Sequence, residues 1–94
     1  MSPDVIADLS QAMARGETVA LVTIVEARGS TPQRVGARMV VHADGRIVGT
    51  IGGGCYESDA FGKGREAIRT RTAQLVRYDR VHWIAVGPLQ SARG

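Results

Sequence analysis

The chain has 94 residues, of which 44% are hydrophobic, and it carries a formal net charge of +3 at pH 7. This length fits one small domain close to the lower limit for an unstapled core, so self-association would help to stabilise it. A single cysteine excludes an internal disulfide, and no apolar run approaches the roughly 18 residues that span a bilayer. Since no signal-like segment opens the chain, we expect a cytoplasmic protein without membrane contact.

The excess positive charge comes mainly from arginine and suits an anionic ligand or an acidic partner surface. Only four aromatic residues are present, and they do not alternate with the arginines. Stacking on nucleic-acid bases is therefore not predicted, and nucleic-acid binding is the weakest of the functional hypotheses.

The first part of the chain predicts a helix followed by a buried strand. Ser2 as N-cap and Pro3 at the first helical position precede apolar residues at helical spacing, and Gly16 ends the pattern. Residues 18–27 are apolar on both alternating faces and rich in β-branched side chains, which is typical of a strand covered on both sides. We expect this strand to be central in the sheet.

Turn signals then separate a loop, a hairpin and a second helix. Residues 28–37 contain glycine, serine, threonine and proline and indicate a loop. Residues 38–42 and 46–50 flank an Asp44–Gly45 turn, which is typical of a hairpin. Residues 56–71 predict a helix with acidic residues in its first turn and arginines near its end.

The rest of the pattern completes a small α/β fold. Gly62 and Gly64 are expected to permit close packing of the second helix against the sheet. Residues 75–78 and 83–86 are candidate strands, and residues 88–94 form a polar, frayed end. We therefore predict one domain over residues 1–94, in which a mixed β-sheet packs with two α-helices.

The most distinctive motif is the glycine run 52–54 followed by Cys55 at the start of the second helix. Consecutive glycines let backbone N–H groups approach a ligand, and the helix N-terminus adds partial positive charge. Both effects favour a thiolate, and hence Cys55 as a nucleophile or a soft-metal ligand. The alternative is a glycine-rich turn followed by a buried, inert cysteine.

The segment 28–39, which includes the loop at residues 28–37, is the second candidate site. Arginine guanidinium groups pair with phosphate or another oxyanion, the glycines let the backbone approach, and hydroxyl groups add polar contacts. The residues concerned are Arg28, Ser30, Arg34 and Arg38. A solvated loop in which these residues only set the turn geometry is the alternative. Because both candidate segments follow strands, we expect the sheet topology to bring them to one edge.

Several motifs in order resemble the N-terminal domain of the xanthine dehydrogenase accessory factors, the XdhC/CoxI family. They are the arginine-rich loop 28–39, the Asp44–Gly45 turn, the glycine–cysteine segment 49–57 and residues 75–79, within a resemblance that covers about residues 5–79. The resemblance implies a molybdenum-cofactor chaperone rather than an enzyme, one that assists insertion into a molybdenum hydroxylase of the xanthine dehydrogenase or CO dehydrogenase type. The family's Rossmann-like second domain is not expected here, and residues 80–88 replace its second cysteine-containing segment.

The resemblance also implies roles for residues. The Cys55 thiolate either binds molybdenum directly or takes part in the sulfur chemistry that converts an oxo ligand to the sulfido form. The amides of Gly53, Gly54 and Cys55 meet an anionic part of the cofactor, while Arg28, Arg34 or Arg38 pairs with its phosphate. Glu57 either bonds a pterin edge or complements the helix dipole, the dipole role being favoured. The cofactor is molybdopterin or a nucleotide form, held transiently. The implied partners are the apo-hydroxylase, a cysteine desulfurase and a second copy of the chain.

Two other functions stay open. A cysteine-dependent enzyme would use Cys55 as nucleophile and would need His42 or His82 close by as its base. A non-catalytic interaction module would pair its sheet edge with itself or with a partner, and its cysteine would be structural. His42 is expected to be solvated at a strand end and His82 has no ligand-like partner, so no zinc site is predicted.

Overall fold

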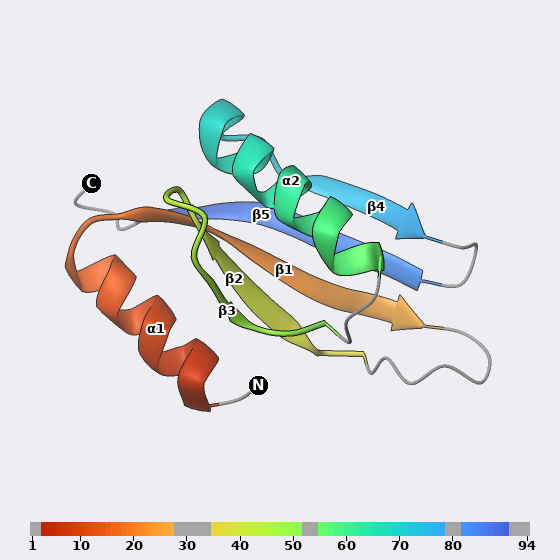
Figure 1. The fold of residues 1–94 in the computed structure, drawn as a ribbon, viewed down its shortest axis with the longest axis horizontal. Helices are drawn as coiled ribbons and strands as arrows, with labels where there is room; N and C mark the ends of the chain where they lie inside the picture. Colours follow the sequence, from red (N-terminus) through yellow and green to blue (C-terminus); the bar gives the residue numbers. More distant parts are fainter. Residues whose placement is uncertain (1–2, 28–34, 52–54, 79–81, 91–94) are drawn as a thin grey trace.

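A computed structural model describes residues 3–27, 35–51, 55–78 and 82–90. Figure 1 shows a twisted sheet with the two helices on opposite sides of it. In chain order the elements are α1 (Pro3–Ala14), β1 (Thr18–Ala27), β2 (Arg38–His42), β3 (Ile47–Gly49), α2 (Cys55–Thr70), β4 (Gln74–Tyr78) and β5 (His82–Gln90). The five strands lie in the order β3-β2-β1-β5-β4.

The predicted α/β class, the two helices and the central place of β1 are confirmed. The sheet is antiparallel rather than mixed, because β1 to β2, β2 to β3 and β4 to β5 are direct connections that reverse the chain. The chain crosses the sheet through α2, from β3 at one edge to β4 at the other. β5 then returns beside β1 and pairs with it antiparallel as well.

β5 continues to Gln90, so the end that was expected to be frayed from residue 88 onward is partly a strand. β4 accompanies β5 only as far as Val86, and beyond that point Pro88 pairs with Ala20 of β1 alone. Proline has no N–H for a second ladder, and it is tolerated in a strand that has one neighbour. The single neighbour explains how this proline fits within a strand.

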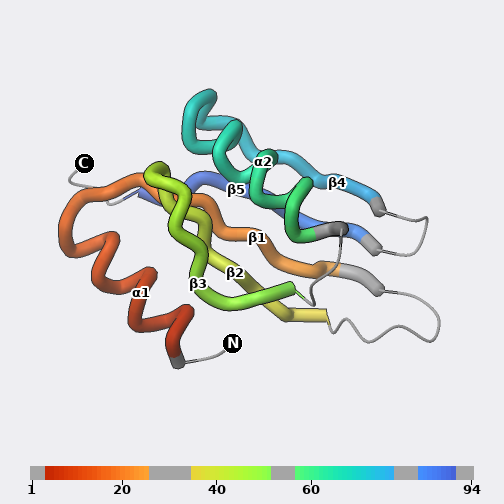
Figure 2. Tube along the Cα trace, in the orientation of Figure 1, coloured from red at the N-terminus to blue at the C-terminus, as the bar shows by residue number. Residues whose placement is uncertain are grey.

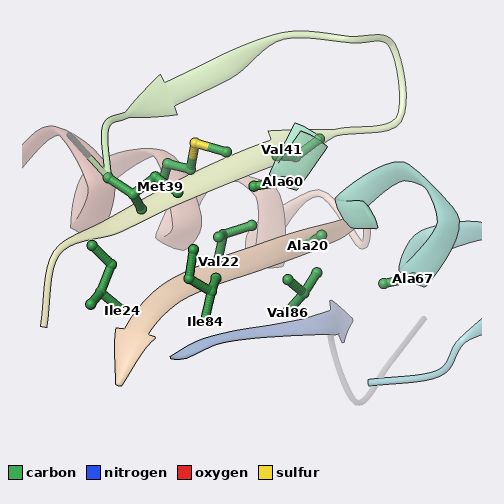
Figure 3. Close-up of a cluster of buried hydrophobic side chains, with 10 residues drawn as sticks. Ala20, Val22, Ile24, Met39, Val41, Ala60, Ala67, Ile84 and Val86 are labelled. Atoms are coloured by element: carbon green, nitrogen blue, oxygen red, sulfur yellow. The ribbon is translucent and has the colours of Figure 1, made fainter. Parts of the chain in front are cut away.

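The main core lies between the sheet and α2. Alternate residues of three strands point to this side and meet Ala60 and Ala67 of the helix (Figure 3). The strand members are Ala20, Val22, Ile24, Met39, Val41, Ile84 and Val86. A second cluster, built from Val5, Ala12, Val19 and Val40, lies under α1. β1 supplies residues to both clusters, which explains why its sequence is apolar on both faces.

Gly64 allows α2 to approach the sheet. A Cβ at this position would lie 3.1 Å from the Cβ of Val41 and 3.4 Å from the Cβ of Ala20. At Gly62, in contrast, no described atom beyond its chain neighbours and the adjacent backbone of α2 lies within 4 Å of the place of a Cβ. The predicted role in close packing is therefore confirmed for Gly64 and wrong for Gly62.

Gly49 plays the matching part on the side of α1. Its φ is +86°, and a Cβ there would lie 2.5 Å from Cγ2 of Val5 and 2.7 Å from the carbonyl oxygen of Arg38. Glycine accepts this left-handed backbone without strain, so α1 can pack directly on the end of β3. Neither helix of the described part is long and apolar enough to cross a bilayer.

Candidate functional site

The two segments that the sequence singles out are flanked by residues at the same end of the sheet (Figures 1 and 2). β1 ends at Ala27, and β2 begins at that end with Arg38 opposite Thr23. β3 ends there as well, since Gly49 pairs with Met39. The flanks of both segments therefore lie at one end of the strands, whereas the convergence of the segments themselves stays a prediction. Five of the predicted site residues lie outside the described residues: Arg28, Ser30, Arg34, Gly53 and Gly54.

Gly36 and Ala37, which directly precede β2, are hydrogen-bonded to β1. The amide of Gly36 donates to the carbonyl oxygen of Ile24 at 2.8 Å, and the amide of Ile24 donates to the carbonyl oxygen of Ala37 at 3.0 Å. This pair of hydrogen bonds continues the β1–β2 pairing past the start of β2. The position of the chain just before Arg38 is therefore set by the sheet.

Arg38 lies on the face of the sheet against which α1 packs. Along β2 it lies on the same face as Val40 and His42, which pack on the α1 side, whereas Met39 and Val41 face α2. Arg38 is half-buried there. The structure thus places this predicted phosphate ligand on the sheet face opposite the helix that begins with Cys55.

Cys55 is the first residue of α2, one residue earlier than predicted, and its side chain lies outside the described residues. Its thiolate chemistry therefore stays a prediction. Within the described part of the chain, no group of three or more His, Cys, Asp and Glu side chains could hold a metal ion.

Glu57 reaches back from the first turn of α2 to the segment before the glycine run. Its Oε2 accepts a hydrogen bond from the amide of Ile51 at 2.9 Å and another from the hydroxyl of Thr50. Glu57 is half-buried, and Ile51 is only 1% exposed. Besides its favourable place at the positive end of the helix dipole, Glu57 therefore has backbone and side-chain partners on the other side of the glycines.

The opposite end of the sheet holds a polar group that the sequence analysis missed. His42 is 3% exposed, and its Nε2 lies 2.6 Å from Oδ2 of Asp8 in α1. The Arg46 guanidinium, which can only donate, lies 3.3 Å from Nδ1. These partners assign the proton to Nε2, which donates it to Asp8. The expectation that His42 is solvated is wrong, because α1 covers this face of β2 and supplies the partner.

His42 borders a cavity of about 390 Å³ that has charges of both signs around it. The Arg15 guanidinium, hydrogen-bonded to Glu17 at 3.0 Å, lowers the pKa of that carboxyl, and the amide of Arg46 lowers the pKa of Asp44. Arg46 and Arg71 line the same cavity, and Nε of Arg46 lies 3.7 Å from Oδ2 of Asp44. Such balanced charge favours no particular ligand.

The position of His42 also bears on the cysteine-dependent enzyme. His42 ends β2, whereas Cys55 follows the end at which β2 begins, so His42 is not placed to serve as the base. His82 is the first residue of β5 and pairs with Ala27, at the same end of the sheet as the glycine run's flanks. Its side chain lies outside the described residues. That hypothesis therefore depends on His82 alone.

Comparison with known proteins supplies the family. The model of the XdhC and CoxI family matches residues 12–79. The molybdenum cofactor insertion chaperone PaoD of Escherichia coli (strain K12) is 38% identical over 68 residues, which are 72% of this chain and 21% of PaoD. A probable xanthine dehydrogenase subunit of Bacillus subtilis (strain 168) is 36% identical over 63 residues, 67% of this chain and 19% of the relative. The chain thus spans about a fifth of the length of each of these curated relatives.

A solved structure shows the same fold. The crystal structure of a xanthine dehydrogenase from Bacillus halodurans superposes with a TM-score of 0.75 at 23% sequence identity. The similarity covers 90% of this chain and 30% of that chain. At this level of identity the comparison supports the arrangement of strands and helices.

Proposed function

Because the chain belongs to the XdhC and CoxI family, we propose that it is an accessory domain that binds molybdenum cofactor and assists its insertion into a molybdenum hydroxylase. The family match over residues 12–79 carries this proposal, since it includes both candidate segments. The name of its relative PaoD, a molybdenum cofactor insertion chaperone, supports the same role. The cofactor is cargo in this proposal, and the domain performs no turnover of its own.

The proposed capture site is the end of the sheet where β1 and β3 finish and α2 starts. Cys55 supplies a soft thiolate for molybdenum, and the amides of Gly53, Gly54 and Cys55 meet an anionic group of the cofactor. Arg28 and Arg34, with Ser30, lie in the loop that supplies charge-assisted hydrogen bonds to phosphate. The common location of the flanks of both segments supports this grouping.

Arg38 is less suited to bind the phosphate than Arg28 and Arg34, because it lies on the sheet face opposite α2. In this proposal it contributes positive charge at the end of the sheet rather than a contact on the side of Cys55.

The partners belong to the proposal as well. They are an apo-hydroxylase of the xanthine dehydrogenase or CO dehydrogenase type, a cysteine desulfurase and a second copy of the chain. The name of the Bacillus subtilis relative supports the first of these. Self-association gains support from Leu75, which is 60% exposed on the edge strand β4.

The test is retention of molybdenum by the purified chain. Anaerobic ultrafiltration with free molybdenum cofactor compares the wild type with Cys55→Ser and with the double variant Cys55→Ser/Ser58→Cys, which moves the only thiol along α2. We expect the wild type to retain at least about tenfold more molybdenum than either variant, as for loss of one strong ligand. Equal retention by all three proteins would contradict the assignment of Cys55.

A further inference from the structure

We propose that Glu57 is a positioning residue that holds together the two ends of the glycine–cysteine turn, residues 51–55. The inference rests on the proposed function, because it concerns the same site, and it gives Glu57 a role other than contact with the cofactor. It follows from what lies on either side of the glycine run.

Both ends of the turn are anchored in the same core. Before the glycines, the Ile51 side chain is 1% exposed and belongs to the cluster under α2. After them, Ala60, less than one helical turn beyond Glu57, is fully buried in that cluster. Glu57 joins the two ends directly, since its Oε2 accepts the amide of Ile51 at 2.9 Å and the hydroxyl of Thr50.

This contact differs from ordinary capping of a helix. In a capping box, the acidic residue at the third helical position accepts the amide of the N-cap residue. Glu57 occupies the third position of α2, and among the described residues it accepts the amide of Ile51, which comes before the glycine run. In the sequence, residues 52–54 therefore lie between the donor and the acceptor of this hydrogen bond.

An enclosing contact is useful at this place because three glycines are costly to order. Glycine loses more backbone freedom than any other residue when its conformation is fixed. Closing a short loop by a charge-assisted hydrogen bond restricts the conformations of the residues inside it. In a site that relies on backbone amides and a thiolate, such restriction keeps the donors in place before the ligand arrives.

The same geometry argues against Glu57 as a direct ligand through Oε2. A pterin N–H bonded to this oxygen would compete with the amide of Ile51, which is part-buried and needs a partner. The structure thus favours support of the turn over the pterin contact.

The substitutions Glu57→Gln and Glu57→Ala separate positioning from charge. Both remove the negative charge, but glutamine keeps an oxygen that can accept from Ile51 and Thr50. A purely electrostatic role would affect both variants equally, whereas a positioning role affects mainly Glu57→Ala. Glu66→Ala, further along α2, removes the same charge outside the turn and is the matched control.

The experiment uses two measurements that need no cofactor and one that does. Hydrogen exchange at the Ile51 amide reports the contact itself, and the rate of Cys55 alkylation by iodoacetamide across pH reports the turn. Because Cys55 is the only cysteine, alkylation is assigned without ambiguity. Retention of molybdenum by ultrafiltration then reports the site.

We expect Glu57→Ala to accelerate exchange at Ile51 about tenfold or more, to shift the alkylation profile of Cys55 and to lower molybdenum retention. Glu57→Gln and Glu66→Ala should stay within about threefold of the wild type in all three measurements. Thr50→Val, which removes one of the contacts described for Glu57, should change the three measurements in the same direction as Glu57→Ala but less. It keeps the proposal testable if Glu57→Ala does not fold.

Unchanged exchange at Ile51, or equal shifts in Glu57→Gln and Glu57→Ala, would overturn the proposal. So would wild-type retention of molybdenum by Glu57→Ala. If the wild type itself retains no molybdenum, the proposed function fails. The positioning role is then decided by exchange and alkylation alone.

Discussion

Replacing Gly62 and Gly64 by alanine, one at a time, tests how closely α2 approaches the sheet. Both glycines lie inside the same helix, and alanine is favoured over glycine there by about 1 kcal/mol. Gly62 faces open space, so Gly62→Ala should raise the free energy of unfolding by about that amount. For a domain of this size, such a gain corresponds to a Tm increase of about 4–8 °C.

Gly64→Ala has the same helix-propensity gain and an added steric cost. Its Cβ would lie 3.1 Å from both Cβ and Cγ2 of Val41, closer than ordinary van der Waals contact, and 3.4 Å from Ala20. Overpacking of a core by one methyl group costs about 1–3 kcal/mol. We therefore expect Gly64→Ala to be less stable than Gly62→Ala by about 1–3 kcal/mol.

The assay is equilibrium urea unfolding, followed by circular dichroism and by Trp83 fluorescence. Comparing the two variants cancels the helix-propensity gain, so their difference reports the contact with the sheet. Adding Val41→Ala to each variant removes the contact with Cγ2 but keeps the contact with Cβ, so it should narrow the difference between the two free energies without abolishing it. If Gly64→Ala is as stable as Gly62→Ala while Val41 is intact, the close approach of α2 is refuted.

The polar groups give the remaining predictions. Asp8→Ala should destabilise the fold by about 1–3 kcal/mol in urea, because it leaves the buried His42 without its carboxylate partner, and an unchanged midpoint would contradict this. The carboxyl pKa values of Glu17 and Asp44 are lowered in the fold, so they contribute stability at neutral pH that is lost as the pH falls through the acid range. Replacing Glu17 by glutamine and Asp44 by asparagine should make the decrease in Tm at acidic pH slightly smaller than in the wild type. A larger decrease would contradict the lowered pKa values of the two carboxyl groups. His42→Ala should leave the alkylation rate of Cys55 unchanged, and slower alkylation would revive His42 as its base.

Much of the fold is predictable because its signals are local. Residues 18–27 indicate the central strand by their continuous apolar, β-branched run, and Asp44–Gly45 indicates the hairpin. The start of α2 follows from the glycine run and the acidic first turn. Each of these patterns acts within a few residues, so no knowledge of the tertiary structure is needed.

The remaining features depend on partners that are distant in the chain. Asp8 and His42 are 34 residues apart, and nothing near either one predicts that a helix will cover that face of β2. Pro88 in the sequence suggests the end of a strand, but it is tolerated because β4 begins opposite Val86 and does not extend alongside Pro88. The contact of Glu57 with Ile51 lies within one motif, yet it looks the same in the sequence as an acidic residue that only complements the helix dipole.

The most direct test of the proposed function is protection of Cys55 from alkylation by molybdenum cofactor. Under anaerobic conditions, the wild-type chain is treated with iodoacetamide at increasing cofactor concentrations, and modified protein is quantified by mass spectrometry. The proposal predicts that the alkylation rate falls with saturation, by about tenfold at full occupancy, as the thiolate becomes a ligand. An unchanged rate while the protein retains molybdenum would place the cofactor elsewhere and contradict capture at the glycine–cysteine turn.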